Sequence, residues 1–238
     1  MLPDLSTRRV EPERMDDPGL PAAEHDAALA GLRRIHAWTG TTGRVWAVVR
    51  RWMLDREEPG SPFRLLDVAC GGGTLLAGLL RRSRRAGLLL HADGADLSEH
   101  AAEVAAEACG GIGGRPPGFL KLDATQEDPP AGYDAVISSL FLHHLDNTTA
   151  AATLGRLGRA APRGLVHDLA RGRQAYLLAA GGCRLLSRSP VVHADGPQSV
   201  AAGFTPGELR GLAAEARLPG VRVSRKPFGR LHLRWGPG

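Results

Sequence analysis

The amino-acid sequence predicts an α/β domain whose doubly wound sheet is mostly parallel, with an antiparallel hairpin at its C-terminal edge. Two observations support this prediction. Short apolar runs alternate with helical patterns from residue 63 to residue 169, the order that builds a parallel sheet. The first apolar run also leads into a glycine-rich turn and then a helix, LLDVACGGGTLLAGLL at 65–80, an arrangement that cradles the charged end of a ligand.

The elements are expected in a regular order along the chain. A polar leader occupies residues 1–20, a helical pattern with a Thr-Gly break at 39–43 follows from Pro21, and a proline- and glycine-rich linker ends at Pro62. The following pattern predicts strands at 63–69, 88–96, 118–124, 133–140 and 163–169, with helices at 74–86, 100–109 and 148–161 between them.

The C-terminal third completes the predicted sheet. Thr205 and Glu208 have the spacing of a capping box, which predicts a helix over 204–217. Two short strands at 221–228 and 231–235 then form the antiparallel edge hairpin.

The chain divides into an N-terminal helical extension, residues 1–60, and a ligand-binding domain, residues 61–238. Residues 170–203 form an insertion between the fifth strand and the last helix, and its stretch 189–200 is expected to be a loop. The insertion mixes apolar residues with few charges, which favours a hydrophobic ligand beside it.

The composition limits the possible functions. The 238 residues are 43% hydrophobic and carry a net charge of +5, with Lys121 and Lys226 the only lysines among 30 basic residues. No nucleic-acid-binding motif accompanies this charge, so we expect no nucleic-acid partner. Three widely spaced cysteines predict neither a disulfide framework nor a metal site. The charged leader and the shortness of the apolar runs predict a cytoplasmic protein without a membrane span.

The glycine-rich turn has an unusual spacing. Asp67 is followed by small residues at every second position, namely Ala69, Gly71 and Gly73, whereas a dinucleotide-binding turn has the pattern G-x-G-x-x-G. A carboxylate at this point would repel a pyrophosphate and would suit a ligand with an amine or a sulfonium. The spacing therefore favours S-adenosylmethionine over NAD.

Further polar residues end the following strands. Asp96 ends the second strand and is placed to bind both ribose hydroxyls, although the start of a helix after it leaves an N-cap role open. Asp123 ends the third strand, where a carboxylate can accept the adenine amino group, and Ser139 ends the fourth. The carboxyl ends of parallel strands meet at one edge of the sheet, so these residues are expected to form one site.

Together these stretches resemble the class I S-adenosylmethionine-dependent methyltransferases, in the small-molecule branch that includes the ubiquinone and menaquinone C-methyltransferases, and imply their Rossmann-like fold. The residues that show the resemblance are LLDVACGGG (65–73), GADLS (94–98), LKLDA (120–124), YDAVISSLFLHHL (133–145) and LVHDL (165–169). The resemblance implies that the cofactor is bound by Asp67, Ala69, Cys70, Gly71 and Gly73 at its methionine end, Asp96 and Leu97 at the ribose, Asp123 and Ala124 at the adenine, and the backbone of Ser139 at the amino-acid end. Ala69 departs from the family, which usually has glycine there, and we expect it to keep a negative φ.

The leader resembles that of some uncharacterised bacterial methyltransferases, several of which are similar to enzymes that modify polyketide-derived phenols or quinones. The similar residues are RRVEPERMDDPGL at 8–20. The functional interpretation is a lid over the cofactor, with Glu13, Asp16 or Asp17 facing the site. The alternative is a surface clamp with no direct role.

Two histidines are the candidate catalytic residues. Methyl transfer is an in-line displacement that depends mainly on alignment, and a phenol or enol nucleophile benefits from a base. His143 and His144 follow the fourth strand, close to where the methyl group is expected. The alternative is that this pair only packs against the cofactor region and moves no proton.

The sequence thus predicts an enzyme that transfers a methyl group from S-adenosylmethionine to a small, hydrophobic phenolic or quinone-like acceptor, by O- or C-methylation. One alternative is a nucleic-acid methyltransferase, which the absence of an Asn-Pro-Pro-aromatic motif after the fourth strand disfavours. The other is a non-catalytic cofactor-binding partner protein.

Overall fold

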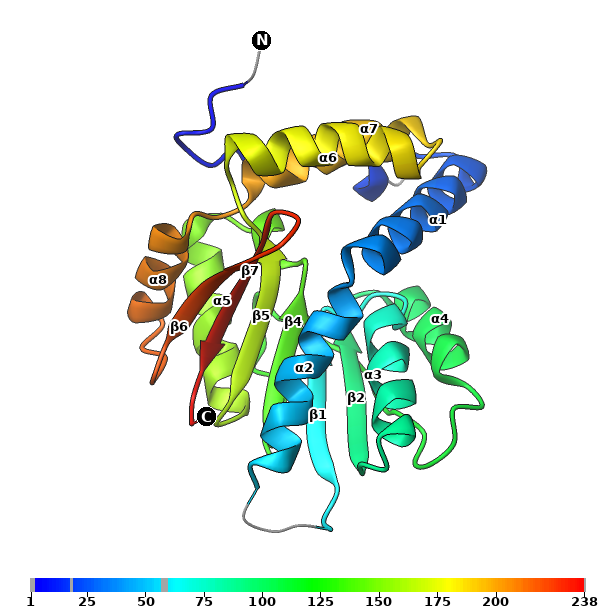
Figure 1. Ribbon diagram of the computed structural model, residues 1–238, viewed down its shortest axis with the longest axis vertical. Helices are drawn as coiled ribbons and strands as arrows, with labels where there is room; N and C mark the ends of the chain where they lie inside the picture. The colour runs from blue at the N-terminus through cyan, green and yellow to red at the C-terminus, as the bar shows by residue number, and fades with distance from the viewer. Residues whose placement is uncertain (1–2, 18, 57–59, 238) are drawn as a thin grey trace.

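Seven strands form one sheet in the order β3-β2-β1-β4-β5-β7-β6 (Figure 1). The computed structural model describes residues 3–17, 19–56 and 60–237. The strands are β1 (Phe63–Val68), β2 (Leu90–Asp96), β3 (Phe119–Lys121), β4 (Ala135–Ser139), β5 (Gly164–Leu169), β6 (Arg222–Lys226) and β7 (Arg230–Trp235). β1 to β5 are parallel, whereas β7 runs antiparallel to both β5 and β6. The predicted fold class is confirmed.

Helices cover both faces of the sheet and the carboxyl ends of its strands (Figure 1). They are α1 (Ala22–Thr39), α2 (Thr41–Leu54), α3 (Thr74–Arg85), α4 (Glu99–Cys109), α5 (Asn147–Ala160), α6 (Arg173–Leu186), α7 (Pro190–Ala202) and α8 (Pro206–Glu215), with short 3-10 turns η1 (Arg14–Asp16) and η2 (Leu142–His144). α2 and α3 share one core with one face of the sheet, and α5 and α8 share another core with the opposite face. α6 and α7 pack on each other above the strand ends.

The strand pattern of β1 explains why the sheet is covered on both sides. Phe63 and Leu65 point into the core beneath α2 and α3, while Leu66 and Val68 point into the core beneath α5. All four are almost completely buried. A strand buried on both faces is mostly apolar, and in β1 only Arg64, which is exposed, and Asp67, which is buried, are charged. The buried acid Asp67 therefore stands out.

Residues 189–200 do not form a loop, and that prediction was wrong. They make up most of α7, which begins after Ser189 with Pro190 in its first turn. The Asp195-Gly196-Pro197 run is a turn signal in isolation. It is overridden here because α7 buries Val191, Val192 and Val200, and tertiary packing outweighs local propensity.

The N-terminal segment, residues 3–17, lies along α7 and η2. The guanidinium of Arg8 donates hydrogen bonds to the carbonyls of Ala202, His143 and Leu145. Further along, the buried carboxylate of Asp195 accepts from the backbone N–H groups of Arg14 and Met15, each at 3.0 Å. Long-range polar bonds therefore fix this segment over the carboxyl ends of the strands.

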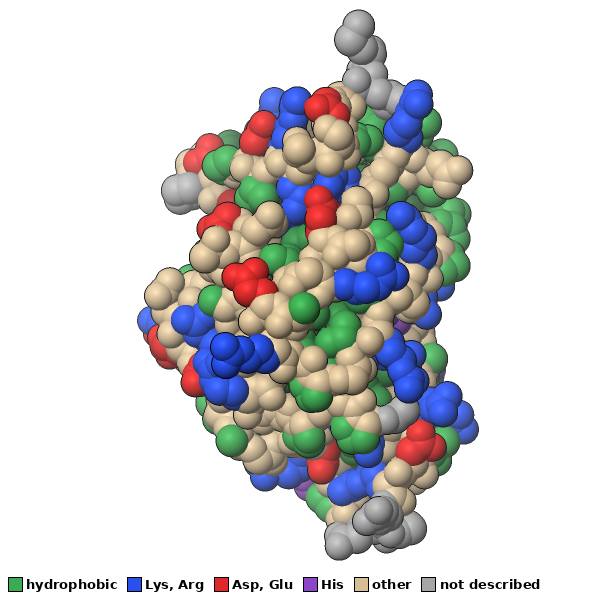
Figure 2. All heavy atoms as spheres, turned by 90° about the vertical axis from the view of Figure 1, so that its left-hand side faces the viewer, with side chains coloured by type: hydrophobic (Ala, Val, Ile, Leu, Met, Phe, Trp, Pro, Cys, Tyr) green, Lys and Arg blue, Asp and Glu red, His purple; other side chains and the backbone are tan. Residues whose placement is uncertain are grey.

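The positive charge of the chain is not gathered on the face of the molecule that includes α8. Figure 2 shows arginines there that are scattered and interspersed with acidic side chains. No helix in the part of the chain that the structure describes is both long enough and apolar enough to cross a bilayer.

Candidate active site

The turn after β1 forms the first part of the site. Its residues Ala69, Gly71 and Gly73 all have positive φ, at 56°, 51° and 68°. This repeated left-handed backbone explains why the sequence has small residues at every second position, because larger side chains are strained there. The expectation of a negative φ at Ala69 was wrong: the turn imposes the left-handed conformation on alanine as well.

The turn is also closely packed on one side and open on the other. A Cβ atom at Gly73 would approach that of Ala105 to 2.7 Å, so only glycine fits against α4. A Cβ atom at Gly71, by contrast, would meet nothing within 4 Å. The open space in front of Gly71 lies at the N-terminal end of α3, where backbone N–H groups favour a negatively charged ligand group.

Asp67 is a buried carboxylate beside this turn. It is 1% exposed, and neither of its oxygens has a hydrogen-bond partner among the described residues. Burial, aided by repulsion from Asp96, raises the pKa of Asp67 to about 8. An unpaired buried carboxylate is costly, and a cationic ligand group would relieve that cost.

Asp96 links the turn to the end of β2. Its carboxylate accepts from the backbone N–H of Gly71 at 2.8 Å and from that of Ser98 at 3.0 Å. Ser98 is the N-cap of α4, because its hydroxyl accepts from the N–H of Ala101. Asp96 is therefore not itself the cap, and its half-buried side chain faces the glycine-rich turn.

The other predicted cofactor residues lie at the carboxyl ends of the four neighbouring strands β3, β2, β1 and β4. Leu97 is exposed after β2, Ala124 is buried beyond β3, and Ser139 is half-buried at the end of β4. Cys70 is half-buried in the turn, and its N–H donates to the carbonyl of Ala95. The carboxylate of Asp123 accepts from the N–H and the hydroxyl of Thr125, so it is held in a local turn.

His143 lies in η2, just after β4, and is almost completely buried. Its Nδ1 is 2.6 Å from a carboxylate oxygen of Asp168 in β5, and its Nε2 is 3.7 Å from Oε1 of Glu13. Burial alone would lower the pKa of His143, but the charges and hydrogen bonds of Asp168 and Glu13 outweigh it and raise the pKa to about 9. Burial alone would raise the pKa of Asp168, but the charge and hydrogen bond of His143 outweigh burial and lower that pKa.

His144 is more exposed and lies beside His143, with 4.2 Å between the ring centroids. Its Nδ1 is 3.8 Å from a carboxylate oxygen of Asp16. Burial and the charge of His143 lower the pKa of His144. Glu13 and Asp16 thus bring two carboxylates from the N-terminal segment to the two histidines, and the hydroxyl of Ser199 in α7 donates to Glu13.

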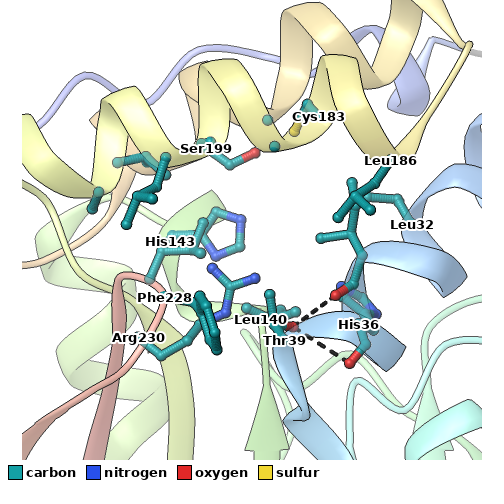
Figure 3. A pocket seen from close by; sticks show the side chains of 18 of the residues that line it. Leu32, His36, Thr39, Leu140, His143, Cys183, Leu186, Ser199, Phe228 and Arg230 are labelled. Carbon is teal, nitrogen blue, oxygen red and sulfur yellow. Dashed lines mark hydrogen bonds between the residues drawn. The ribbon is translucent and has the colours of Figure 1, made fainter.

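A cavity of about 470 Å³ opens beside these residues (Figure 3). Its walls come from α1, α6, α7 and the hairpin between β6 and β7, and they include Leu32, Ile35, Leu140, Leu177, Leu178 and Phe228. Its polar groups include Glu13, Asp16, His143, His144 and Arg230. The cavity therefore combines a largely apolar wall with one polar, ionisable end.

Several of these residues were missed by sequence analysis. Arg230 and Phe228 line the cavity, but the sequence at the start of β7 and in the turn before it gives no sign of such a role. The ring of His193 bonds to the carbonyl of Ser187, and His167 packs against His232 inside the sheet. Neither of these two histidines lines the cavity.

Comparisons with known proteins find similar methyltransferases. Residues 66–165 match the family model described as a methyltransferase domain. An uncharacterised methyltransferase of Mycobacterium tuberculosis is 31% identical over 192 residues, which cover 77% of this chain and 91% of that protein. A protein from Mycobacterium bovis with the same description matches equally.

Solved structures with low sequence identity share the fold. A putative O-methyltransferase from Nostoc punctiforme superposes with a TM-score of 0.63 at 16% identity, covering 96% of this chain, which spans 64% of that protein. Magnesium protoporphyrin IX methyltransferase from Synechocystis, solved with bound S-adenosylhomocysteine, gives 0.55 at 18% identity over 93% of this chain and 90% of that one. An O-methyltransferase family 2 protein from Planctomyces limnophilus, in complex with apigenin, gives a TM-score of 0.57 at 20% identity. The match covers 92% of this chain and 63% of that one.

Proposed function

Because the chain belongs to the S-adenosylmethionine-dependent methyltransferases, we propose that it methylates a small, hydrophobic phenolic or quinone-like acceptor. The observation that supports this acceptor is the cavity, whose apolar wall ends at the histidine and carboxylate groups around His143. An apolar pocket with a few convergent polar groups is typical of a small-molecule site.

The residues at the strand ends fit S-adenosylmethionine. When bound, it supplies a sulfonium methyl group that an acceptor nucleophile can displace. We propose that Asp67, which is unpaired and buried, receives the cationic amino end of the cofactor. The space in front of Gly71 admits the amino-acid part of the cofactor, and Asp96 binds the ribose hydroxyls.

Cofactor affinity is expected to rise with pH between pH 6 and 7. The raised pKa of Asp67, about 8, keeps its carboxyl protonated in the free protein, while a bound ammonium group favours the ionised form, so binding releases a proton. Affinity for S-adenosylhomocysteine should therefore increase by up to about tenfold per pH unit below the pKa. Calorimetry in two buffers of different ionisation enthalpy measures both the affinity and the released proton.

Two variants separate this effect from general damage. Asp67→Asn should bind more weakly at pH 7 and should lose both the pH dependence and the proton release. Asp96→Asn should move the pH dependence to lower pH, because it removes the repulsion that helps to raise the pKa of Asp67. A pH dependence that survives in Asp67→Asn would contradict the role of this carboxylate.

The polar end of the cavity is where we place the reacting atom of the acceptor. Asp168 holds the ring of His143 so that Nε2 faces Glu13 and the cavity. We propose that His143 and His144 promote ionisation of an acceptor hydroxyl or enol there. Such ionisation would promote O-methylation of a phenol and also C-methylation of a ring carbon beside the phenol oxygen.

The mouth of the cavity supports a hydrophobic acceptor. Three leucines of α6 that line it are well exposed, Leu177 at 56%, Leu178 at 54% and Leu185 at 84%, and Trp38 of α1 is 58% exposed. Apolar side chains gathered at the mouth of a pocket are typical of a site that binds apolar ligands.

A panel of acceptors tests the proposal. Phenols and hydroquinones with and without an alkyl substituent are incubated with the enzyme and labelled S-adenosylmethionine, and methylated products are measured by mass spectrometry. We expect the alkylated members to have the higher kcat/KM, by about tenfold for two buried methylene groups. Leu177→Asp should remove that preference, whereas the exposed Leu89→Asp, remote from the cavity lining, should not. Methylation of RNA with no turnover on the panel would contradict the proposal.

A further inference from the structure

Three side chains at the polar end of the cavity have their ligand atoms close together. A carboxylate oxygen of Glu13 and one ring nitrogen each of His143 and His144 all lie within 4.8 Å of one another. Two of these residues are neighbours in η2, and the third comes from the N-terminal segment that packs beside it. The folded chain, and not a local sequence motif, brings them together.

The orientation of His143 is that of a metal ligand supported by a carboxylate. Its Nδ1 is held by Asp168 at 2.6 Å, which leaves Nε2 directed towards Oε1 of Glu13 at 3.7 Å. Two atoms bound to one zinc-like ion at a tetrahedral angle are about 3.4 Å apart, so a shift of a few tenths of an ångström brings the Glu13 and His143 atoms to that spacing. The ring of His144 has to turn to complete the set, whose atoms lie within 4.8 Å of one another. Histidines that bind metals usually donate their second N–H to a carboxylate in this way.

The charge around the two histidines also favours a cation. Glu13, Asp16 and Asp168 place three carboxylates on two imidazoles. Two guanidinium groups also lie near this cluster: Arg8 bonds to the backbone carbonyls of His143 and Leu145, and Arg230 lines the cavity. Both interact electrostatically with Asp168. Neither guanidinium forms an ion pair with Glu13 or Asp16 in the described part of the chain. Oε1 of Glu13 accepts a hydrogen bond from the Ser199 hydroxyl, which leaves it a second lone pair for a cation.

We propose that Glu13, His143 and His144 bind one divalent transition-metal cation at the polar end of the cavity. Two imidazoles and a carboxylate suit Zn²⁺, Co²⁺, Mn²⁺ or Fe²⁺ and do not suit Mg²⁺ or Ca²⁺, which prefer oxygen ligands alone. Asp168 is a positioning residue for His143, and Asp16 adds charge beside His144.

The remaining coordination positions of the cation would face the cavity. An acceptor hydroxyl placed there would bind through its oxygen and lose its proton to solvent more readily, because a divalent cation lowers the pKa of a bound hydroxyl. This use of the cation rests on the proposed function, whereas the binding of the cation does not.

Titration of the tag-free full-length chain with CoCl₂ tests the site, because Co²⁺ in a nitrogen- and oxygen-ligated site of low coordination number absorbs visible light. We expect one equivalent to bind with an absorption band that excess Zn²⁺ abolishes. Glu13→Gln and His143→Ala should each lose the band, and Asp168→Asn should weaken binding by about 10- to 100-fold. The matched controls Glu11→Gln and His193→Ala should titrate as the native chain does.

The outcomes are distinguishable from those of the proposed function. Each variant is first shown to bind S-adenosylhomocysteine, which establishes that the sheet and its turn are folded. Absence of the band in the native chain, or equal binding by Glu13→Gln and His143→Ala, would overturn the metal site. Methylation of the phenol panel in excess chelator would overturn the role of the cation but leave the proposed function intact. Cation binding without turnover on any acceptor would support the metal site and contradict the proposed function.

Discussion

Replacing His143 with alanine is expected to lower the single-turnover rate of methyl transfer by about 10²–10⁴-fold while cofactor affinity stays close to the native value. The ring lies at the polar end of the cavity and contacts Asp168 and Glu13, and among the described residues no hydrogen bond joins it to the glycine-rich turn. The variant therefore removes activation of the acceptor and spares the cofactor residues. Rapid-quench measurement with enzyme in excess reports the rate, and calorimetry with S-adenosylhomocysteine reports the affinity.

His193→Ala is the matched control for this variant. It removes the same ring from α7, where the ring bonds to the carbonyl of Ser187 outside the cavity lining. Its single-turnover rate should remain within a few-fold of native. If His143→Ala keeps a near-native rate, the histidine pair has only a packing role. A loss of cofactor affinity without a loss of rate would place the pair in the cofactor pocket instead.

Removal of residues 1–20 is expected to abolish turnover, by at least about 10²-fold, and to leave a folded domain that binds the cofactor. The deletion removes Glu13 and Asp16 from the histidines and Arg8 from the end of α7. The hydrogen bonds of the described leader residues go to η2, α5, α7, neighbouring loops and the leader itself, and none reaches residues 69–73. Circular dichroism, calorimetry and turnover are measured on the same preparation.

Two point variants sharpen this test. Arg8→Ala loses three bonds to backbone carbonyls and should release part of the segment, with a fall in turnover. Arg9→Ala, whose side chain is exposed, should not. Full activity of the truncated chain would show that the leader is a dispensable clamp and not a functional lid.

The sheet and its cofactor edge could be predicted because they depend on local patterns. β1 and β2 each have an acid at or next to the carboxyl end, and their parallel pairing follows from the helix between them. The small residues of the turn could be recognised from their spacing, but the sign of φ at Ala69 could not. That sign is set by the whole turn and not by the preference of alanine.

The acceptor end of the site could not be predicted, because its residues are distributed along the chain. Glu13, Leu32, Leu178 and Phe228 line one cavity but come from four distant segments. The α7 helix was missed because its Asp-Gly-Pro run has turn propensity, and only burial against α1 and α6 explains why it is helical. Tertiary packing determines both features.

The hydrogen bond between Arg8 and Ala202 joins a residue made early in translation to one made late. These residues are 194 positions apart, so at about 5–20 residues per second a ribosome needs about 10–40 s to produce the partner after the arginine. The strands that carry the cofactor residues are complete well before that time. During biosynthesis the two halves of the site should therefore mature in sequence, with a nascent domain able to hold its cofactor before the segment made first returns to close the acceptor end.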